Sequence, residues 1–246
     1  MLKQRSGGRR QEFPDIVEGG RLDPALVSEA LEAIGDSGNP PIVSDSLRLV
    51  KRLPDSGLAV KYSMGEIREP GADMFGRHLR AHLLDKYFVL SGKYRREHVP
   101  EPAGFFDSEL SGKPVSGYAY PFTEGKANFD TVFVDYVDGR RVDFHRTVDE
   151  WGEFQNLMKD AGFDFSSRNF DKGAWAGGVP YYEDIVYFGR QTEEKFSSEW
   201  AVFDFCKDHV RFSEPKFDEF LGKNEAALRE RLGDRDFQRL KHPKNR

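Results

Sequence analysis

Two carboxylates, Asp184 and Asp204, stand at the ends of two short apolar segments. Asp184 opens the segment 184–188, and Asp204 directly follows the apolar run 200–203. Both runs have the length and residue types of buried strands, and the polar residues between them predict a β-hairpin. In such a hairpin the two carboxylates lie at the same end. Mg²⁺ takes one or two protein carboxylates together with phosphate oxygens, so this pair predicts a magnesium site.

A structural role for these acids is the alternative. The chain contains 21 Phe, and it repeats the pattern of an aspartate between an apolar residue and a phenylalanine at Asp143, Asp164 and Asp204. An aspartate beside aromatic residues is therefore partly a habit of this sequence. An acid at the end of a buried strand still needs a partner, a cation or a metal, because an isolated buried charge is costly. Both interpretations stay open at this point.

Lys61 is the third candidate for chemistry. It lies in the segment 58–62, where strand alternation places Ala59 and Lys61 on the same face. If that face is covered, the ammonium must find a phosphate or a carboxylate. The alternative is a solvent-facing lysine on an edge hairpin.

Two histidines, His78 and His82, are spaced four residues apart on a predicted helix and could share a metal ion. The residues between them lack the glutamate of the H-E-x-x-H zinc motif, and no third ligand is apparent in the sequence. Metal binding by this pair is the weaker of the two metal hypotheses.

Hydrophobic periodicity and turn signals predict the elements that must position these residues. The first half predicts a helix at 24–35, strands at 46–53 and 57–63, a helix at 73–90, and strands at 99–106 and 116–122. The second half predicts strands at 131–136 and 141–144, a helix at 147–161, an irregular stretch at 163–182, the acidic hairpin, and a helix at 215–232. The helix at 73–90 is expected to bury a stripe formed by Phe75, Leu79, Leu83, Tyr87 and Leu90.

Composition limits the class of protein. With 246 residues, 38% of them hydrophobic and 13% aromatic, the chain can bury a core. A net charge of −5 argues against a nucleic-acid partner. One cysteine fits a reducing compartment, and no apolar run reaches the length of a membrane span. We therefore expect a soluble, cytoplasmic α+β protein with a flexible basic arm at 1–20.

The order of elements, with a lysine-bearing strand before a helix and two more strands, resembles the amino-terminal lobe of a protein-kinase-like fold. It is most similar to the aminoglycoside-phosphotransferase branch. The segment 59–61, Ala-Val-Lys, resembles the lysine strand of that family, and 118–125, from Tyr118 to Gly125, resembles its hinge. The segment 199–205 resembles the strand with the metal-binding aspartate, and 184–188 resembles the strand before it, where the family normally has a metal-binding asparagine.

This resemblance implies a bilobal α+β architecture, with a β-rich lobe at 21–125 and a small or truncated mixed lobe at 126–246. It also implies that Lys61 contacts the phosphates of ATP, with Gly35 and Gly38 left from the phosphate loop. Asp204 would hold Mg²⁺, and Asp184 would replace the family's asparagine.

Several positions depart from the family pattern. Val179 stands where the family has its catalytic aspartate, and no His-Arg-Asp or His-Gly-Asp sequence occurs. Asp164 or Asp171 could supply a base by a displaced route. The expectation is a pseudokinase or strongly diverged phosphotransferase that binds ATP and Mg²⁺, with no residue assigned as catalytic. The alternative is a non-catalytic α+β module that acts through protein contacts.

Overall fold

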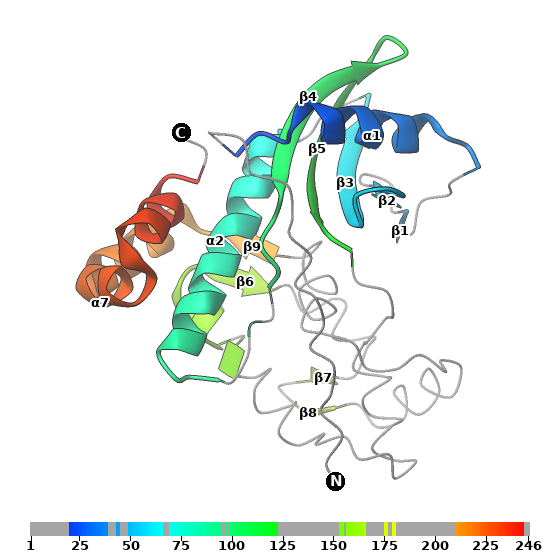
Figure 1. Ribbon diagram of the computed structural model, residues 1–246. Helices are drawn as coiled ribbons and strands as arrows, with labels where there is room; N and C mark the ends of the chain where they lie inside the picture. The colour runs from blue at the N-terminus through cyan, green and yellow to red at the C-terminus, as the bar shows by residue number, and fades with distance from the viewer. Residues whose placement is uncertain are drawn as a thin grey trace, which may run out of the picture.

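A five-stranded antiparallel sheet with helices on both faces is the centre of the computed structural model (Figure 1). The structure describes residues 20–38, 43–44, 49–65, 69–94, 97, 99–122, 153–154, 156–165, 175–176, 179–180 and 210–243. The predicted mixed α+β class is confirmed. The predicted boundary between lobes near residue 125, the strands at 131–136 and 141–144, and most of the basic arm lie outside the described residues.

The sheet has the strand order β1-β2-β3-β5-β4. Its strands are β1 (Val43–Ser44), β2 (Leu49–Arg52), β3 (Leu58–Met64), β4 (Gly104–Leu110) and β5 (Lys113–Pro121). The predicted hairpin of β2 and β3 is confirmed, with Val50 opposite Lys61. Because the connection from β3 to β4 crosses the sheet, β5 lies between these two strands and β3 becomes central. Residues buried on both faces are therefore expected along β3, and six of its seven residues are buried.

Helix α1 (Pro24–Gly35) packs on one face of the sheet. It begins as predicted, because the Asp23 carboxylate accepts a hydrogen bond of 2.8 Å from the Ala25 amide and Pro24 occupies the first turn. Ala30, Ala33 and Ile34 face the sheet and join a core that contains the β3 side chains of Leu58, Val60 and Tyr62.

Helix α2 (Gly71–Leu90) covers the opposite face. Gly71 approaches the sheet so closely that a Cβ there would lie 2.5 Å from the Gly117 carbonyl oxygen, which only glycine permits. Phe75, Leu79 and Leu83 are buried as predicted. Tyr87 is only partly buried, and Leu90 is 47% exposed. The expected burial of Leu90 is wrong, since the helix ends there and the chain turns through Ser91 and Gly92.

The hairpin of β4 and β5 is longer than the sequence predicted. The expected strands at 99–106 and 116–122 left residues 107–115 between them, whereas only Ser111 and Gly112 separate the observed strands. Both residues have positive φ, at 52° and 76°, as a tight two-residue hairpin turn requires. The polar residues 107–109 and the pair Lys113-Pro114 hid these strand ends, because this end of the hairpin is mostly solvent-exposed.

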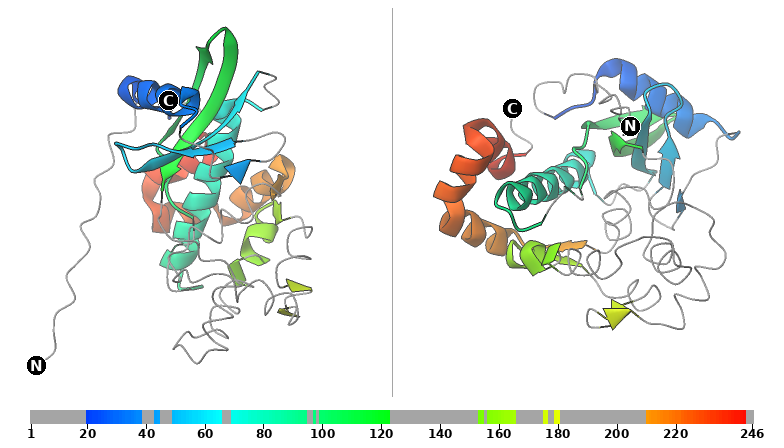
Figure 2. Two further views of the ribbon diagram at one scale, coloured as in Figure 1. Left: turned by 90° about the vertical axis from the view of Figure 1, so that its right-hand side faces the viewer. Right: turned by 60° about the horizontal axis from the view of Figure 1, so that its bottom comes forward.

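Helix α7 (Glu214–Lys241) packs on the side of α2 that faces away from the sheet, so α2 lies between the sheet and α7 (Figure 2). Its described boundaries correct the predicted helix at 215–232. The helix departs from helical geometry at Gly233, with φ 79° and ψ 163°, and continues to Lys241. Gly233 interrupts the helical pattern of the sequence, which is why the pattern predicted that the helix ends at Leu232. Buried residues of α7, among them Phe217 and Leu228, share one core with α2.

The remaining described elements are short. Residues 156–160 are helical, within the predicted helix, and Gly162 ends this segment with a φ of 91°. The stretch 163–182, predicted as irregular, contains strands β6 (Phe163–Phe165), β7 (Trp175–Ala176) and β8 (Val179–Pro180). Strand β6 pairs with β9 (Val210–Phe212). Among the described helices, none combines the length and the hydropathy that a bilayer crossing requires.

Candidate functional site

Lys61 lies in the middle of the central strand β3, and its residue is only 3% exposed. Its neighbours in register are Val50 on β2 and Tyr118 on β5. Directly opposite residues of antiparallel strands share a face, so all three lie on the face that α2 covers. Of the two alternatives that the sequence left open, the covered face is the one observed, and the solvent-facing lysine on an edge hairpin is wrong. A buried ammonium requires anionic or carbonyl partners, which makes this face the candidate site.

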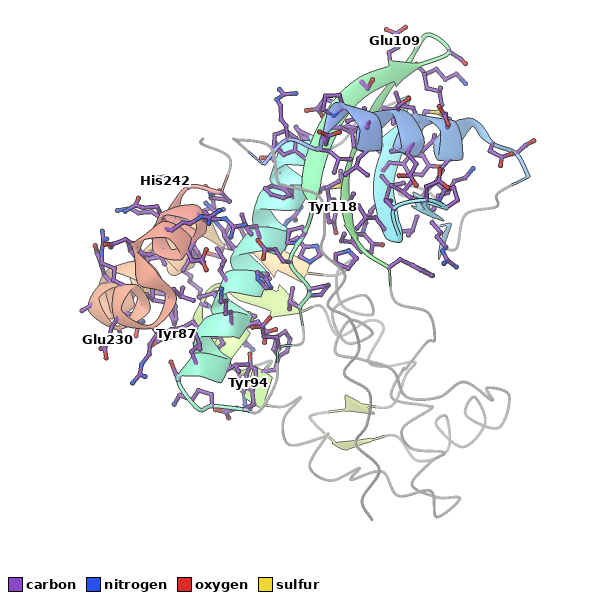
Figure 3. All side chains as sticks on the ribbon, viewed as in Figure 1. Tyr87, Tyr94, Glu109, Tyr118, Glu230 and His242 are labelled. Carbon is purple, nitrogen blue, oxygen red and sulfur yellow. The ribbon has the colours of Figure 1, made fainter. Side chains whose placement is uncertain are left out.

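Aromatic rings surround this position on the β5 side. Tyr118 lies between β5 and α2 (Figure 3), and its ring centroid is 5.5 Å from that of Tyr120. His78 of α2 meets Tyr118 edge to face, at 5.4 Å and 84°, and its ring lies 6.0 Å from Tyr120. The polarisable rings of Tyr118, Tyr120 and His78 therefore lie on the β5 side of Lys61, and the His78 ring is a titratable imidazole.

A row of polar residues lies further along the same face of the sheet, near the start of α2. Ser63, Ser116 and Asp107 occupy one row across β3, β5 and β4. The Gly71 amide donates to the Ser116 hydroxyl at 2.6 Å, and this hydroxyl in turn donates to the Asp107 carboxylate. The positive end of the α2 dipole is thus balanced by a carboxylate of the chain itself. The hydroxyl of Ser63 is buried and has no hydrogen-bond partner among the described residues.

The two histidines of α2 bind backbone carbonyls. His78 Nε2 lies 2.9 Å from the Pro100 oxygen, and His82 Nδ1 lies 2.8 Å from the Val99 oxygen. A carbonyl only accepts, so each of these nitrogens carries the proton. No cluster of three potential metal ligands occurs among the described residues. The geometry gives this pair a structural role, which is to hold the segment 99–101 that leads into β4.

Asp85 completes this arrangement one turn further along α2. Its carboxylate accepts hydrogen bonds from the Val99 amide at 2.7 Å and from the Tyr94 hydroxyl at 2.5 Å. Burial, reinforced by the Asp85 charge, raises the pKa of Tyr94 well above its ordinary value. The spacing of His78, His82 and Asp85 along one buried stripe of α2 was the sequence signal for a polar segment packed against it.

Lys51 is a second buried lysine, and sequence reasoning missed it. It is 5% exposed and lies on β2, one residue after Val50 and therefore on the face that α1 covers. Its ammonium donates to the carbonyls of Ala33 at 2.8 Å, Ile34 at 3.2 Å and Asp36 at 2.7 Å. These are carbonyls that the last turn of a helix leaves without partners. Lys51 therefore caps α1, which has no basic residue in its own last turn.

Gly35 and Gly38 lie at this capped end of α1. Gly35 is the last residue of the helix, and the Gly38 amide donates to the Asp36 carboxylate at 2.8 Å. The surrounding groups are carbonyl and carboxylate acceptors, and the C-terminal end of a helix carries partial negative charge. The structure places both glycines on the α1 face, away from Lys61. A phosphate-binding role for them stays a prediction that the local chemistry does not favour.

The other predicted site residues lie outside the described residues or on the short strands β6 and β8. Asp184, Asp204 and Asp171 lie outside the described residues, so their metal-binding or catalytic roles stay predictions. Val179, at the position of the family's catalytic aspartate, lies in β8 opposite Ala176. Asp164 lies on β6, opposite Arg211 of β9 in register. Comparisons of the chain with protein-family models, with curated proteins and with solved structures find no match.

Proposed function

We propose that this protein is a kinase-like nucleotide-binding protein that does not transfer phosphate, a pseudokinase in its chemistry. One observation carries the proposal. Lys61 is buried at the centre of β3, on the sheet face that the next helix, α2, covers. Protein kinases place their phosphate-binding lysine on the third strand and pair it with a glutamate of the following helix.

The departures from the family support the non-catalytic part of the proposal. Helix α2 contains no glutamate, and its buried acid Asp85 is engaged by Tyr94 and Val99. Val179 has no group that could accept a proton from a substrate hydroxyl. We propose with it a bilobal architecture, with a β-rich lobe at 21–125 and a mixed lobe at 126–246, in which the nucleotide would lie beside the α2 face.

The described residues fit the phosphates of the proposed cofactor, whereas the residues proposed for its Mg²⁺ lie outside the described part of the chain. A lysine ammonium on a largely apolar and aromatic face fits phosphate oxygens, and Lys61 is the residue that would hold them. Mg²⁺ would be held by Asp184 and Asp204, and it would neutralise phosphate charge. The remaining proposals, a cytoplasmic location and no nucleic-acid partner, follow from composition alone.

A second function is favoured by one specific observation. The other buried acidic and basic side chains of the described residues, Lys51, His78, His82 and Asp85, bind backbone groups. A chain that uses buried polar groups in this way can use Lys61 in the same way. In that case the protein is a non-catalytic α+β module that acts through protein contacts.

A thermal-shift titration with ATP, with and without Mg²⁺, separates the two functions. Nucleotide binding stabilises the folded state by RT ln(1 + L/Kd), where L is the free ligand concentration, so the melting temperature rises with the logarithm of ligand concentration once that concentration exceeds Kd. We expect Lys61→Met to abolish this rise, while Lys51→Met lowers the starting temperature but keeps the rise. An absent response of the wild-type protein to ATP, ADP and GTP refutes the first function and leaves the second.

A further inference from the structure

The last two turns of α7 are set apart from the rest of the helix. At Gly233 the backbone leaves the helical region, so the segment 234–241 is joined to residues 214–232 through one non-helical residue. A Cβ at Gly233 would contact nothing within 4 Å, and its positive φ is the reason for glycine there. Gly233 is therefore a hinge between the two parts of α7.

A small set of contacts holds the segment in place. Phe237 and Leu240 are its buried apolar residues. Asp236 accepts a 2.8 Å hydrogen bond from Lys86 of α2, and Arg239 donates to Glu101 at 2.5 Å and to Asp236 at 3.1 Å. Across Gly233, Arg229 pairs with Asp234 at 2.5 Å and its guanidinium lies 4.3 Å from the centre of the Phe237 ring. The segment is thus fixed by ion pairs to Arg229, Lys86 and Glu101 and by two buried apolar side chains, while residues 214–232 bury Phe217, Leu221 and Leu228.

These ion pairs connect residues 234–241 with α2, which covers the candidate site, and with the segment that precedes β4. Lys86 belongs to α2, and Glu101 belongs to the segment 99–103 that leads into β4. His78 of α2 also holds the segment 99–103, through a hydrogen bond to the Pro100 carbonyl. The ring of His78 contacts the ring of Tyr118, which is opposite Lys61. A continuous chain of contacts therefore runs from the end of α7 to Lys61.

We propose that residues 234–241 form a latch that opens about Gly233 without global unfolding, and that its closure fixes α2 and the segment 99–103 beside Lys61. The ion pairs are partly exposed, with the Asp236 side chain 13% and the Arg239 side chain 20% accessible, so salt screens them in part and charge substitution removes them. The apolar pair and the single hinge residue limit the opening to this segment. The part of the proposal that concerns nucleotide affinity rests on the proposed function; the opening of the latch does not.

Native-state hydrogen exchange tests the opening directly. In the wild-type protein we expect amides of 236–241 to exchange faster than those of 216–232, and 0.5 M NaCl to widen the difference. Arg239→Gln should accelerate exchange in 236–241 and 99–103 by about tenfold, since a hydrogen bond to a charged group contributes roughly that factor or more. Arg235→Gln, an exposed arginine of the same segment, is the matched control and should change neither. Equal exchange in 216–232 and 236–241 overturns the latch, as does an unchanged rate in Arg239→Gln.

Titration with Mg-ATP then tests the connection to Lys61. We expect Arg239→Gln to weaken Mg-ATP binding severalfold and Arg235→Gln to leave it unchanged. Faster exchange with unchanged affinity refutes the coupling and retains the latch. If the wild-type protein binds no Mg-ATP, the proposed nucleotide function and the coupling both fail, while the exchange rates still decide whether the latch exists.

Discussion

Lys51 gives the sharpest test of how this fold is held together. Replacing it with methionine keeps the aliphatic stem but removes an ammonium that donates to three carbonyls at the end of α1, at 2.8, 3.2 and 2.7 Å. Each buried carbonyl left without a donor costs about 1–3 kcal/mol, and the lost charge at the helix terminus costs up to about 2 kcal/mol.

Two effects make the loss of stability in Lys51→Met smaller than the sum of these contributions. The variant no longer has to bury an ammonium, whose desolvation costs several kcal/mol. The residues at the end of the helix, Gly35 and Asp36, are exposed, so water can reach part of the vacated carbonyls. We therefore expect the free energy of unfolding to fall by about 3 kcal/mol, within the range for a broken buried polar network.

Urea unfolding at neutral pH measures this loss for Lys51→Met. Lys113→Met is the control, because Lys113 is exposed on β5 and should change stability by less than about 0.5 kcal/mol. Hydrogen exchange should place the effect in the last turn of α1. A loss below about 1 kcal/mol for Lys51→Met, or a loss equal to that of the control, would show that the ammonium does not cap the helix.

Three further predictions follow from single contacts. Ser63→Ala should leave the free energy of unfolding unchanged or raise it by up to about 1 kcal/mol, because its buried hydroxyl has no partner among the described residues. Ser116→Ala should lower the free energy of unfolding by about 1–2 kcal/mol, because it removes the hydroxyl that accepts from the Gly71 amide. A Ser63→Ala variant that is less stable than Ser116→Ala in urea unfolding contradicts this prediction. Gly71→Ala should lower the free energy of unfolding by about 3 kcal/mol, since its Cβ would lie 2.5 Å from a carbonyl oxygen. The control Gly222→Ala, in an open helical position, should raise the free energy of unfolding by about 0.5–1 kcal/mol. Calorimetric melting temperatures compare the two variants. Burial alone raises the pKa of Asp236, but its ion pairs with a lysine of α2 and an arginine of α7 bring the pKa below the ordinary value. A depressed pKa stabilises the fold above about pH 4 and loses this effect as the pH falls further, so the stability advantage over Asp236→Asn should be full at pH 6 and shrink below pH 4. An advantage that is independent of pH refutes that assignment.

Local signals predicted much of the first half of the fold. Asp23-Pro24 placed the start of α1, and the turn before Gly57 placed the hairpin of β2 and β3, because both depend on residues close in sequence. The β4–β5 hairpin was misjudged because its outer half is mostly polar and solvent-exposed. The continuation of α7 beyond Gly233 was missed for a related reason: the glycine interrupts the helical pattern, and tertiary contacts to α2 hold the rest.

The candidate site was predicted in part. Strand alternation placed Lys61 on the same face as Ala59 but left open whether that face is covered, which the structure answers by burying both residues. Alternation alone did not reveal that Lys51, ten residues earlier, is also buried, because its partners are carbonyls at the end of a helix in another part of the chain. Backbone acceptors carry no sequence signal. The same limit hid the partners of His78 and His82, which are carbonyls of residues 99 and 100.

Calorimetric titration of the full chain with Mg-ATP tests the central claim, that Lys61 belongs to a nucleotide site. We predict measurable binding to the wild-type protein, loss of binding in Lys61→Met, and retained binding in Lys51→Met despite its lower stability. Binding that is equal in wild type and Lys61→Met, or absent from the wild-type protein, would contradict the claim.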